Sequence, residues 1–174
     1  DDPLFRQGYD PFANDPDFSG MLLTQPHWGL YNDGDNNGKG GKLRADIHAP
    51  EAWAITTGSP SVIIASLDTG VDYTHPDMAD KIWTNSREIP DNGIDDDGNG
   101  YVDDWRGWDF VNHDNDPMDD HEEQGMHVLH GTFTAGIAAA GSDNGIGVAG
   151  VAWRCPIMIC KVIGADGSGL EDDC

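Results

Sequence analysis

An aspartate and a histidine stand at places in this sequence where two side chains could do chemistry together. Asp68 directly follows the apolar run "SVIIASL", and His130 directly precedes the small-residue run "GTFTAGIAAAG". A carboxylate after a buried parallel strand lies at the sheet edge where α/β proteins build their sites. A helix N-terminus favours the neutral form of an imidazole, which suits a general base. These positions alone leave two interpretations open for each residue: a site carboxylate or a turn-forming aspartate for Asp68, and a general base or a surface or helix-capping histidine for His130.

A second histidine, His127, raises the alternative of a zinc site in the same stretch. It lies three residues before His130. The sequence is not H-E-x-x-H, however, and no third ligand stands at a recognisable spacing. The spacing therefore opposes a zinc site and leaves the role of His127 open.

The acidic stretch "DNGIDDDGNGYVDD", residues 91–104, has the spacing of a calcium loop. Oxygen ligands on alternate residues can converge on one hard cation, with a glycine, here Gly100, at the sharp turn. Position 12 is Arg106 rather than Glu, so we expect Asp104 or Asp109 to close the site; a solvated acidic loop is the alternative. The predicted ligands at positions 1, 3, 5, 7 and 9 are Asp95, Asp97, Asn99, Tyr101 (through its carbonyl oxygen) and Asp103.

The composition favours a cation as a partner and excludes two other classes. The chain has 174 residues, with 9 basic and 32 acidic side chains and a net charge of −23. Nucleic-acid binding requires a basic surface, which this chain lacks. No apolar run approaches the roughly 18 residues of a membrane span, so we expect no membrane partner. A weaker copy of the calcium pattern occurs at Asp33, Asp35 and Asn37.

The elements that must position these residues follow an α/β order. Residues 1–42 are turn-rich and form a separate N-terminal segment. A short helix is predicted within residues 48–58 and a second over about 131–140. Strands are predicted within 61–68 and 156–164, and their continuous apolar runs indicate a parallel sheet that is buried on both faces.

Two further features concern the acidic insert and the cysteines. Residues 91–123 hold 13 acidic residues and one arginine, so we expect this insert to lie outside the core. Cys155 and Cys160 are five residues apart on a predicted strand and face opposite sides, which opposes a disulfide between them. The partner of Cys174 stays open.

Two long blocks, "SVIIASLDTGVDYTHPDM" and "HGTFTAGIAAAGSDNGIGVAGVAWRCPIMICKVIGADGSG", resemble the Asp and His signature blocks of the subtilisin-like serine proteases, peptidase family S8. The resemblance runs from about Gln25 to Leu170. It implies an α/β fold of three layers with a mostly parallel sheet, of which residues 43–174 form the N-terminal part. That fold would be incomplete in this chain.

The resemblance also implies a calcium-dependent, secreted serine endopeptidase. Asp68 would orient His130, which would take a proton from a serine and return it to the leaving amine. The backbone of a polypeptide substrate would pair with Gly167, Ser168 and Gly169 of "GADGSG".

A second calcium site and two partners are further implications of the resemblance. The second site would join Asp77 to the loop residues Asn144, Ile146 and Val148. A propeptide, or the missing C-terminal half of the domain, would be a partner of the chain.

The sequence departs from the family pattern at two points. Phe133 replaces the histidine that usually follows "HGT", and no G-T-S-M-A block with its nucleophile is present. We expect that the chain is a fragment that is inactive alone; a non-catalytic protease-like domain and a calcium-binding structural module are the alternatives. None of the chain's serines has the nucleophile context: they stand at positions 19, 59, 61, 66, 86, 142 and 168.

Overall fold

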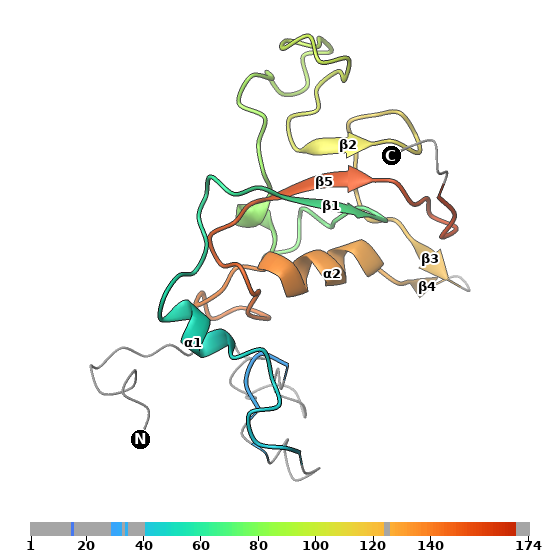
Figure 1. The fold of residues 1–174 in the computed structure, drawn as a ribbon. Helices are drawn as coiled ribbons and strands as arrows, with labels where there is room; N and C mark the ends of the chain where they lie inside the picture. The colour runs from blue at the N-terminus through green and yellow to red at the C-terminus, as the bar shows by residue number, and fades with distance from the viewer. Residues whose placement is uncertain (1–14, 16–28, 33, 35–40, 124–125, 170–174) are drawn as a thin grey trace.

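The computed structural model describes residue 15 and residues 29–32, 34, 41–123 and 126–169. Both predicted helices and both predicted strands are present. In chain order the elements are α1 (Ala49–Trp53), β1 (Ile64–Asp68), the 3-10 helix η2 (Ala79–Lys81), β2 (Gly107–Asp109), β3 (Glu122–Glu123), β4 (Met126–His127), α2 (His130–Ala139) and β5 (Ile157–Lys161) (Figure 1).

The central sheet has three strands in the order β1-β5-β2, and all its pairings are parallel. β5 is the middle strand although it is the last in the sequence, so the chain crosses over between neighbouring strands. Asp68 at the end of β1 lies opposite Lys161 at the end of β5. This arrangement confirms the predicted α/β class with a parallel sheet. β3 and β4 form a separate antiparallel hairpin.

The position of β2 corrects one expectation from the sequence. The acidic window 91–123 was expected to lie wholly outside the core, but residues 107–109 pair with β5 in the sheet. Asp109 in this strand is fully buried. Oδ1 accepts the backbone N–H groups of Val111 and Asn112, and Oδ2 accepts the side-chain amide of Asn112, so both buried oxygens have donors. A strand of three residues is too short to show a hydrophobic period, so composition alone hides it.

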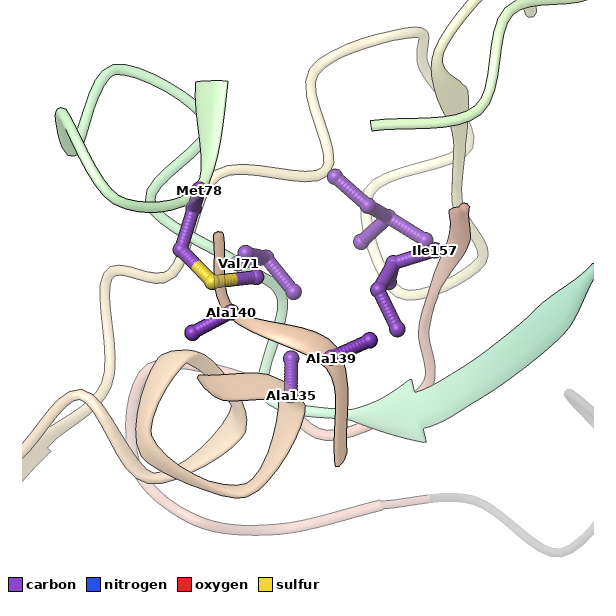
Figure 2. Packing of buried hydrophobic residues seen from close by; sticks show 7 residues of the cluster. Val71, Met78, Ala135, Ala139, Ala140 and Ile157 are labelled. Atoms are coloured by element: carbon purple, nitrogen blue, oxygen red, sulfur yellow. The ribbon is translucent and has the colours of Figure 1, made fainter. Parts of the chain in front are cut away.

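The core lies between α2 and one face of the sheet, as Figure 2 shows. Alanines of α2 contact apolar side chains from the sheet and from the segment after β1, and their small size brings the helix axis close to the strands. The cluster consists of Val71, Met78, Ala135, Ala139, Ala140, Ile157 and Ile159. The opposite face of β1 is open: Leu67 is 55% exposed, so the prediction of burial on both faces was wrong. Among the described elements, α2 covers one face only.

A smaller cluster joins α1 to the segment that precedes β5. Trp53 of α1 lies 4.6 Å from Trp153 between ring centroids, and both pack with neighbouring apolar residues. Cys155 is buried, Cys160 is half-buried, and both are free thiols.

Several predicted features fall outside the described residues, among them Asp33, Asp35, Asn37, Cys174 and most of segment 1–42. Within the part of the chain that is described, no helix combines the length and the apolar character that crossing a membrane requires.

Candidate functional site

The predicted carboxylate–imidazole pair comes together where β1 ends and α2 begins. Nδ1 of His130 lies 2.7 Å from Oδ1 of Asp68, across 62 positions of sequence. The approach depends on Gly131, because a Cβ there would lie 2.1 Å from the carbonyl oxygen of Gly70. The absence of a side chain at this helix position therefore brings the two functional groups within hydrogen-bond distance.

The carboxylate of Asp68 is held by three donors. Besides the His130 ring, Oδ1 accepts the backbone N–H of Thr69 at 2.7 Å, and Oδ2 accepts the Thr134 hydroxyl at 3.0 Å. Burial of Asp68 raises its pKa, but these hydrogen bonds stabilise the charged form more strongly and hold the pKa below its ordinary value. Asp68 is therefore an ionised, fixed acceptor at neutral pH.

The pKa of His130 is raised above its ordinary value, opposite to the expectation from its place at a helix N-terminus. The hydrogen bond to Asp68 is the largest cause, followed by the charge of Asp68; the charge of Asp119 adds a smaller contribution. A paired carboxylate in direct contact favours the imidazolium more than the helix dipole disfavours it. The sequence pattern could not show this, because the carboxylate comes from a distant strand.

The pair can act as an oriented general base. Since Asp68 accepts from Nδ1, that nitrogen carries the hydrogen in the neutral ring and Nε2 carries the free lone pair. The His130 side chain is 59% exposed, whereas that of Asp68 is 13% exposed. One partner is thus fixed in the protein while the other faces the surface, where an incoming group can reach it.

The predicted substrate residues lie in a turn that follows β5. Gly164 donates its N–H to the carbonyl oxygen of Ser168 at 2.8 Å, and Ile163 forms an isolated antiparallel bridge with Gly169. Gly167, Ser168 and Gly169 are all exposed. This turn leaves the sheet at the same edge as Asp68, since β1 and β5 are parallel and both end there.

In the acidic insert, Asp95 and Asp97 are the two predicted calcium ligands that belong to one group of carboxylates. Carboxylate oxygens of Asp95 and Asp97 lie within 4.8 Å of each other and of Glu88. Asn99 instead donates its amide to Asp104 at 3.0 Å. Tyr101 packs its ring against Trp108 and Phe110, with centroids 5.1 and 5.8 Å away.

Asp103 belongs to a neighbouring turn rather than to this group of carboxylates. Its two oxygens accept the backbone N–H groups of Asn92 and Gly93 at 3.0 and 2.8 Å. Asp104, expected as a closing ligand, accepts the amide of Asn85. The second expected closing ligand, Asp109, lies in β2.

Glu88 is the member of the group that the sequence analysis missed. It lies before the loop, and no calcium-loop motif includes a position there. Its side chain is buried; Oε1 accepts the N–H of Asp97 at 3.0 Å, while Oε2 is buried and has no hydrogen-bond partner among the described residues. An unpaired buried carboxylate oxygen is costly unless a cation or a donor satisfies it.

The second predicted calcium cluster is assembled around Asp77, which is buried. Its oxygens accept the Asn144 amide at 3.0 Å and the Val148 N–H at 2.9 Å. Ile146 donates its N–H to Asn144 Oδ1 at 2.8 Å. The loop therefore contacts the carboxylate through N–H donors, and calcium binding at these residues stays a prediction.

Asp15 is a further acidic group at this loop, and the sequence analysis did not single it out. It is fully buried, and its oxygens accept the N–H groups of Asp143 and Asn144. Burial raises the pKa of Asp15, and the nearby charge of Asp77 raises it too. The two carboxylates thus repel each other across a loop that could bind a cation between them. No sequence signal marks Asp15, which lies far from both partners along the chain.

His127 lies on β4, in the hairpin that precedes α2. The structure describes the backbone of His127 but not its side chain.

Comparison with known proteins shows which family the sequence resembles. The sequence model of the protein family described as "Subtilase family" matches residues 59–173 of this chain. Subtilisin-like protease 1 of Plasmodium vivax is 44% identical over 101 residues, which are 58% of this chain and 15% of that protein. Thermitase of Thermoactinomyces vulgaris is 37% identical over 123 residues, 71% of this chain and 33% of that protein. The chain therefore spans a third or less of the length of these relatives.

Solved structures give the same fold. A serine protease of Aeromonas sobria superposes with a TM-score of 0.64 at 22% identity, over 97% of this chain and 25% of that one. The same enzyme in complex with a chaperone gives 0.61 over 98% and 25% of the two chains. A protease of Pseudoalteromonas arctica gives 0.58 at 28% identity, over 93% and 42%.

Proposed function

We propose, because this chain belongs to the subtilase family, that it supplies the aspartate and the histidine of a serine endopeptidase. The observation that carries the proposal is the 2.7 Å contact between His130 Nδ1 and Asp68 Oδ1, which leaves Nε2 as the base. A surface histidine would not require a fixed, ionised carboxylate behind its ring. Among the described residues, the group of side chains that could hold a metal ion does not include His130.

In the proposed reaction, each residue moves or holds one proton. His130 Nε2 takes the proton of a serine hydroxyl while the serine oxygen attacks the carbonyl carbon of a peptide bond. The imidazolium then gives this proton to the amine that leaves, and water repeats the sequence to release the acyl group. Asp68 keeps its charge throughout and stabilises the imidazolium. The serine itself is proposed to come from sequence that family members carry beyond the matched region.

The proposed substrate is a polypeptide, bound in extended form along the exposed Gly167–Gly169 segment through backbone hydrogen bonds. A propeptide or a chaperone is a proposed partner, on the example of the Aeromonas sobria enzyme solved with one. We also propose a secreted location and residues 43–174 as the N-terminal part of the catalytic domain, as the family resemblance implies.

Expression from the complete reading frame tests the activity. We expect hydrolysis of a denatured protein substrate, labelling by a serine-directed fluorophosphonate, and loss of hydrolysis in His130→Ala. His113→Asn, at another exposed histidine, is the matched control and keeps full activity. If the wild-type protein neither hydrolyses peptides nor takes the label, the non-catalytic alternative replaces this proposal.

We further propose that the chain binds calcium through the Glu88–Asp95–Asp97 group. The buried, unpaired Oε2 of Glu88 fits this proposal, because a hard divalent cation prefers carboxylate oxygens and would satisfy it. A bound calcium ion would neutralise converging negative charge and tie the insert to the segment before it. The observation that supports the second site is the pair of buried carboxylates, Asp15 and Asp77, on the loop of Asn144, Ile146 and Val148.

Calorimetric titration with calcium chloride tests the first site. Glu88→Gln keeps the size of the side chain and removes its charge, so we expect weakening of one binding step by at least about tenfold. Asp91→Asn removes one charge from an exposed position of the same insert and leaves that step unchanged. Equal weakening by both substitutions would show a diffuse charge effect and reject the site.

A further inference from the structure

Asp119 joins the two halves of the candidate active site although it belongs to neither. It lies between β2 and β3 and is 4% exposed. Oδ1 accepts the hydroxyl of Thr69 at 2.9 Å; Oδ2 accepts the backbone N–H and the hydroxyl of Thr132 at 2.8 and 2.7 Å. Thr69 is the residue after Asp68, and Thr132 is in the first turn of the helix that begins at His130.

The hydroxyl oxygens of the same two threonines each accept a further backbone N–H, from the opposite segment. Thr69 Oγ1 accepts the N–H of Gly131 at 2.8 Å, and Thr132 Oγ1 accepts the N–H of Asp72 at 2.8 Å. The first turn of α2 is therefore bonded to the loop after β1 through hydroxyls that both donate to one carboxylate.

Asp119 also accepts a hydrogen bond from a backbone N–H of the first turn of α2, which the N-cap residue does not do. The first N–H groups of a helix have no partners within it, and a side chain at the N-cap normally accepts one of them. Here the N-cap residue, Leu129, makes no side-chain cap hydrogen bond. The carboxylate of Asp119 takes that place from a distant segment, and its negative charge suits the positive end of the helix dipole.

The segment that carries Asp119 is itself fixed to the sheet. Lys161, buried in the central strand, donates its ammonium group to the carbonyl oxygen of Met118 at 2.9 Å and forms an ion pair with Asp120. Gly70 permits close contact on the other side, because a Cβ there would lie 2.6 Å from the carbonyl oxygens of both Pro117 and Met118. Asp119 is thus held between two anchored neighbours.

We propose that Asp119 is the positioning residue of the Asp68–His130 pair: it locks the first turn of α2 against the loop after β1, so that His130 Nδ1 stays within reach of Asp68. The reactive role of the pair rests on the proposed endopeptidase function. The positioning itself does not depend on it, and its loss is measurable without a substrate.

Asp119 also acts on His130 through its charge. Asp68 from β1 and Asp119 from the β2–β3 segment are the charged groups that favour the imidazolium, with Asp68 the stronger. Removal of the Asp119 charge therefore lowers the pKa of His130, and loss of the close Asp68 contact lowers it further.

An NMR titration of the His130 imidazole tests the charge and the geometry together, with the His130→Gln spectrum for assignment. In Asp119→Asn we expect the midpoint to fall by roughly half a pH unit or more. Asp116→Asn removes the same charge from an exposed position three residues away and is expected to leave the midpoint unchanged. Equal midpoints in wild type and Asp119→Asn overturn the proposal, whether or not the protein hydrolyses peptides.

A second pair of variants keeps every charge and changes only the connection. Thr69→Val removes the hydroxyl between Asp119 and the Gly131 N–H, and Thr69→Ser retains it. In the complete enzyme we expect Thr69→Val to lower kcat on the order of 10- to 100-fold with KM little changed, and Thr69→Ser to restore most of it. A fall in kcat that Thr69→Ser does not restore would assign Thr69 to packing alone and reject the proposed connection.

Discussion

The candidate catalytic pair and the acidic insert both concentrate carboxylates, but the chain treats them differently. Around Asp68, the carboxylate oxygens accept from a ring N–H, a backbone N–H and a hydroxyl within 3.0 Å. Glu88, from the segment before the insert, and Asp95 and Asp97 within it place three carboxylates within 4.8 Å of one another. Arg87 lies 3.3 Å from Asp97, yet its side chain is 75% exposed.

The difference shows which site the polypeptide completes by itself. At the pair, both oxygens of Asp68 accept hydrogen bonds from donors of the chain itself. At the carboxylate group of the insert, one buried oxygen of Glu88 has no donor in the described part of the chain. We therefore expect substitutions of its own side chains to have the largest effect at the Asp68–His130 pair. At the Glu88–Asp95–Asp97 group, we expect the supply of a cation to have the largest effect.

The largest expected effect comes from breaking the pair at its fixed partner. Asp68→Asn keeps the shape but no longer holds the imidazole in the correct tautomer, so for the proposed endopeptidase we expect kcat to fall by about 10⁴-fold. Steady-state hydrolysis by the complete enzyme measures this. Asp80→Asn, at an exposed aspartate in η2, is the control; a loss below tenfold in Asp68→Asn would contradict the assigned role.

Removal of calcium tests whether the acidic insert depends on a bound cation. At a free calcium concentration about 100 times the Kd, one site stabilises the fold by about 2.7 kcal/mol. For a chain of this size we expect a chelator to lower the Tm by roughly 5–10 °C, measured by circular dichroism. Magnesium should restore little of the loss, since it requires a tighter octahedral site. Superimposed melting curves with calcium and with chelator would contradict the calcium proposal.

Substitution of two glycines of α2 distinguishes the effect of a close backbone contact from the effect of helix propensity. Gly131→Ala forces a Cβ to within 2.1 Å of the Gly70 carbonyl oxygen, and we expect destabilisation by about 1–3 kcal/mol. Gly136→Ala meets no atom within 4 Å and is expected to stabilise the helix by about 0.5–1 kcal/mol. Urea unfolding measures both; a loss of stability in Gly136→Ala similar to that in Gly131→Ala would remove the special role of the contact.

The smallest effect is the pH dependence of the pair. The raised pKa of His130 contributes stability below the ordinary value of 6.5, which is lost as pH rises through the folded value. The lowered pKa of Asp68 contributes stability above the ordinary 3.8, which is lost as pH falls through the folded value. Wild type should therefore exceed His130→Gln in Tm more at pH 5 than at pH 9, and the acidic limb of kcat/KM should lie above 6.5. An equal Tm difference at both pH values would show that the pair is not coupled.

The sequence by itself determined the residues of the candidate pair and the class of the fold. The apolar run before Asp68 and the small residues after His130 specify a strand and a helix, because local periodicity and side-chain size decide these elements. The alternating aspartates likewise marked Asp95 and Asp97 as neighbours, because residues close in a loop are close in space.

Only the tertiary structure decided which side chains contact the predicted site residues. Glu88, Asp15 and Asp119 reach their sites from segments with no motif, and β2 is too short to have a pattern. The raised pKa of His130 depends on a carboxylate 62 residues away, which outweighs the local effect of the helix. Hydrogen bonds and charge pairs form between groups that folding brings together, so their partners depend on the packing of distant segments rather than on spacing along the chain.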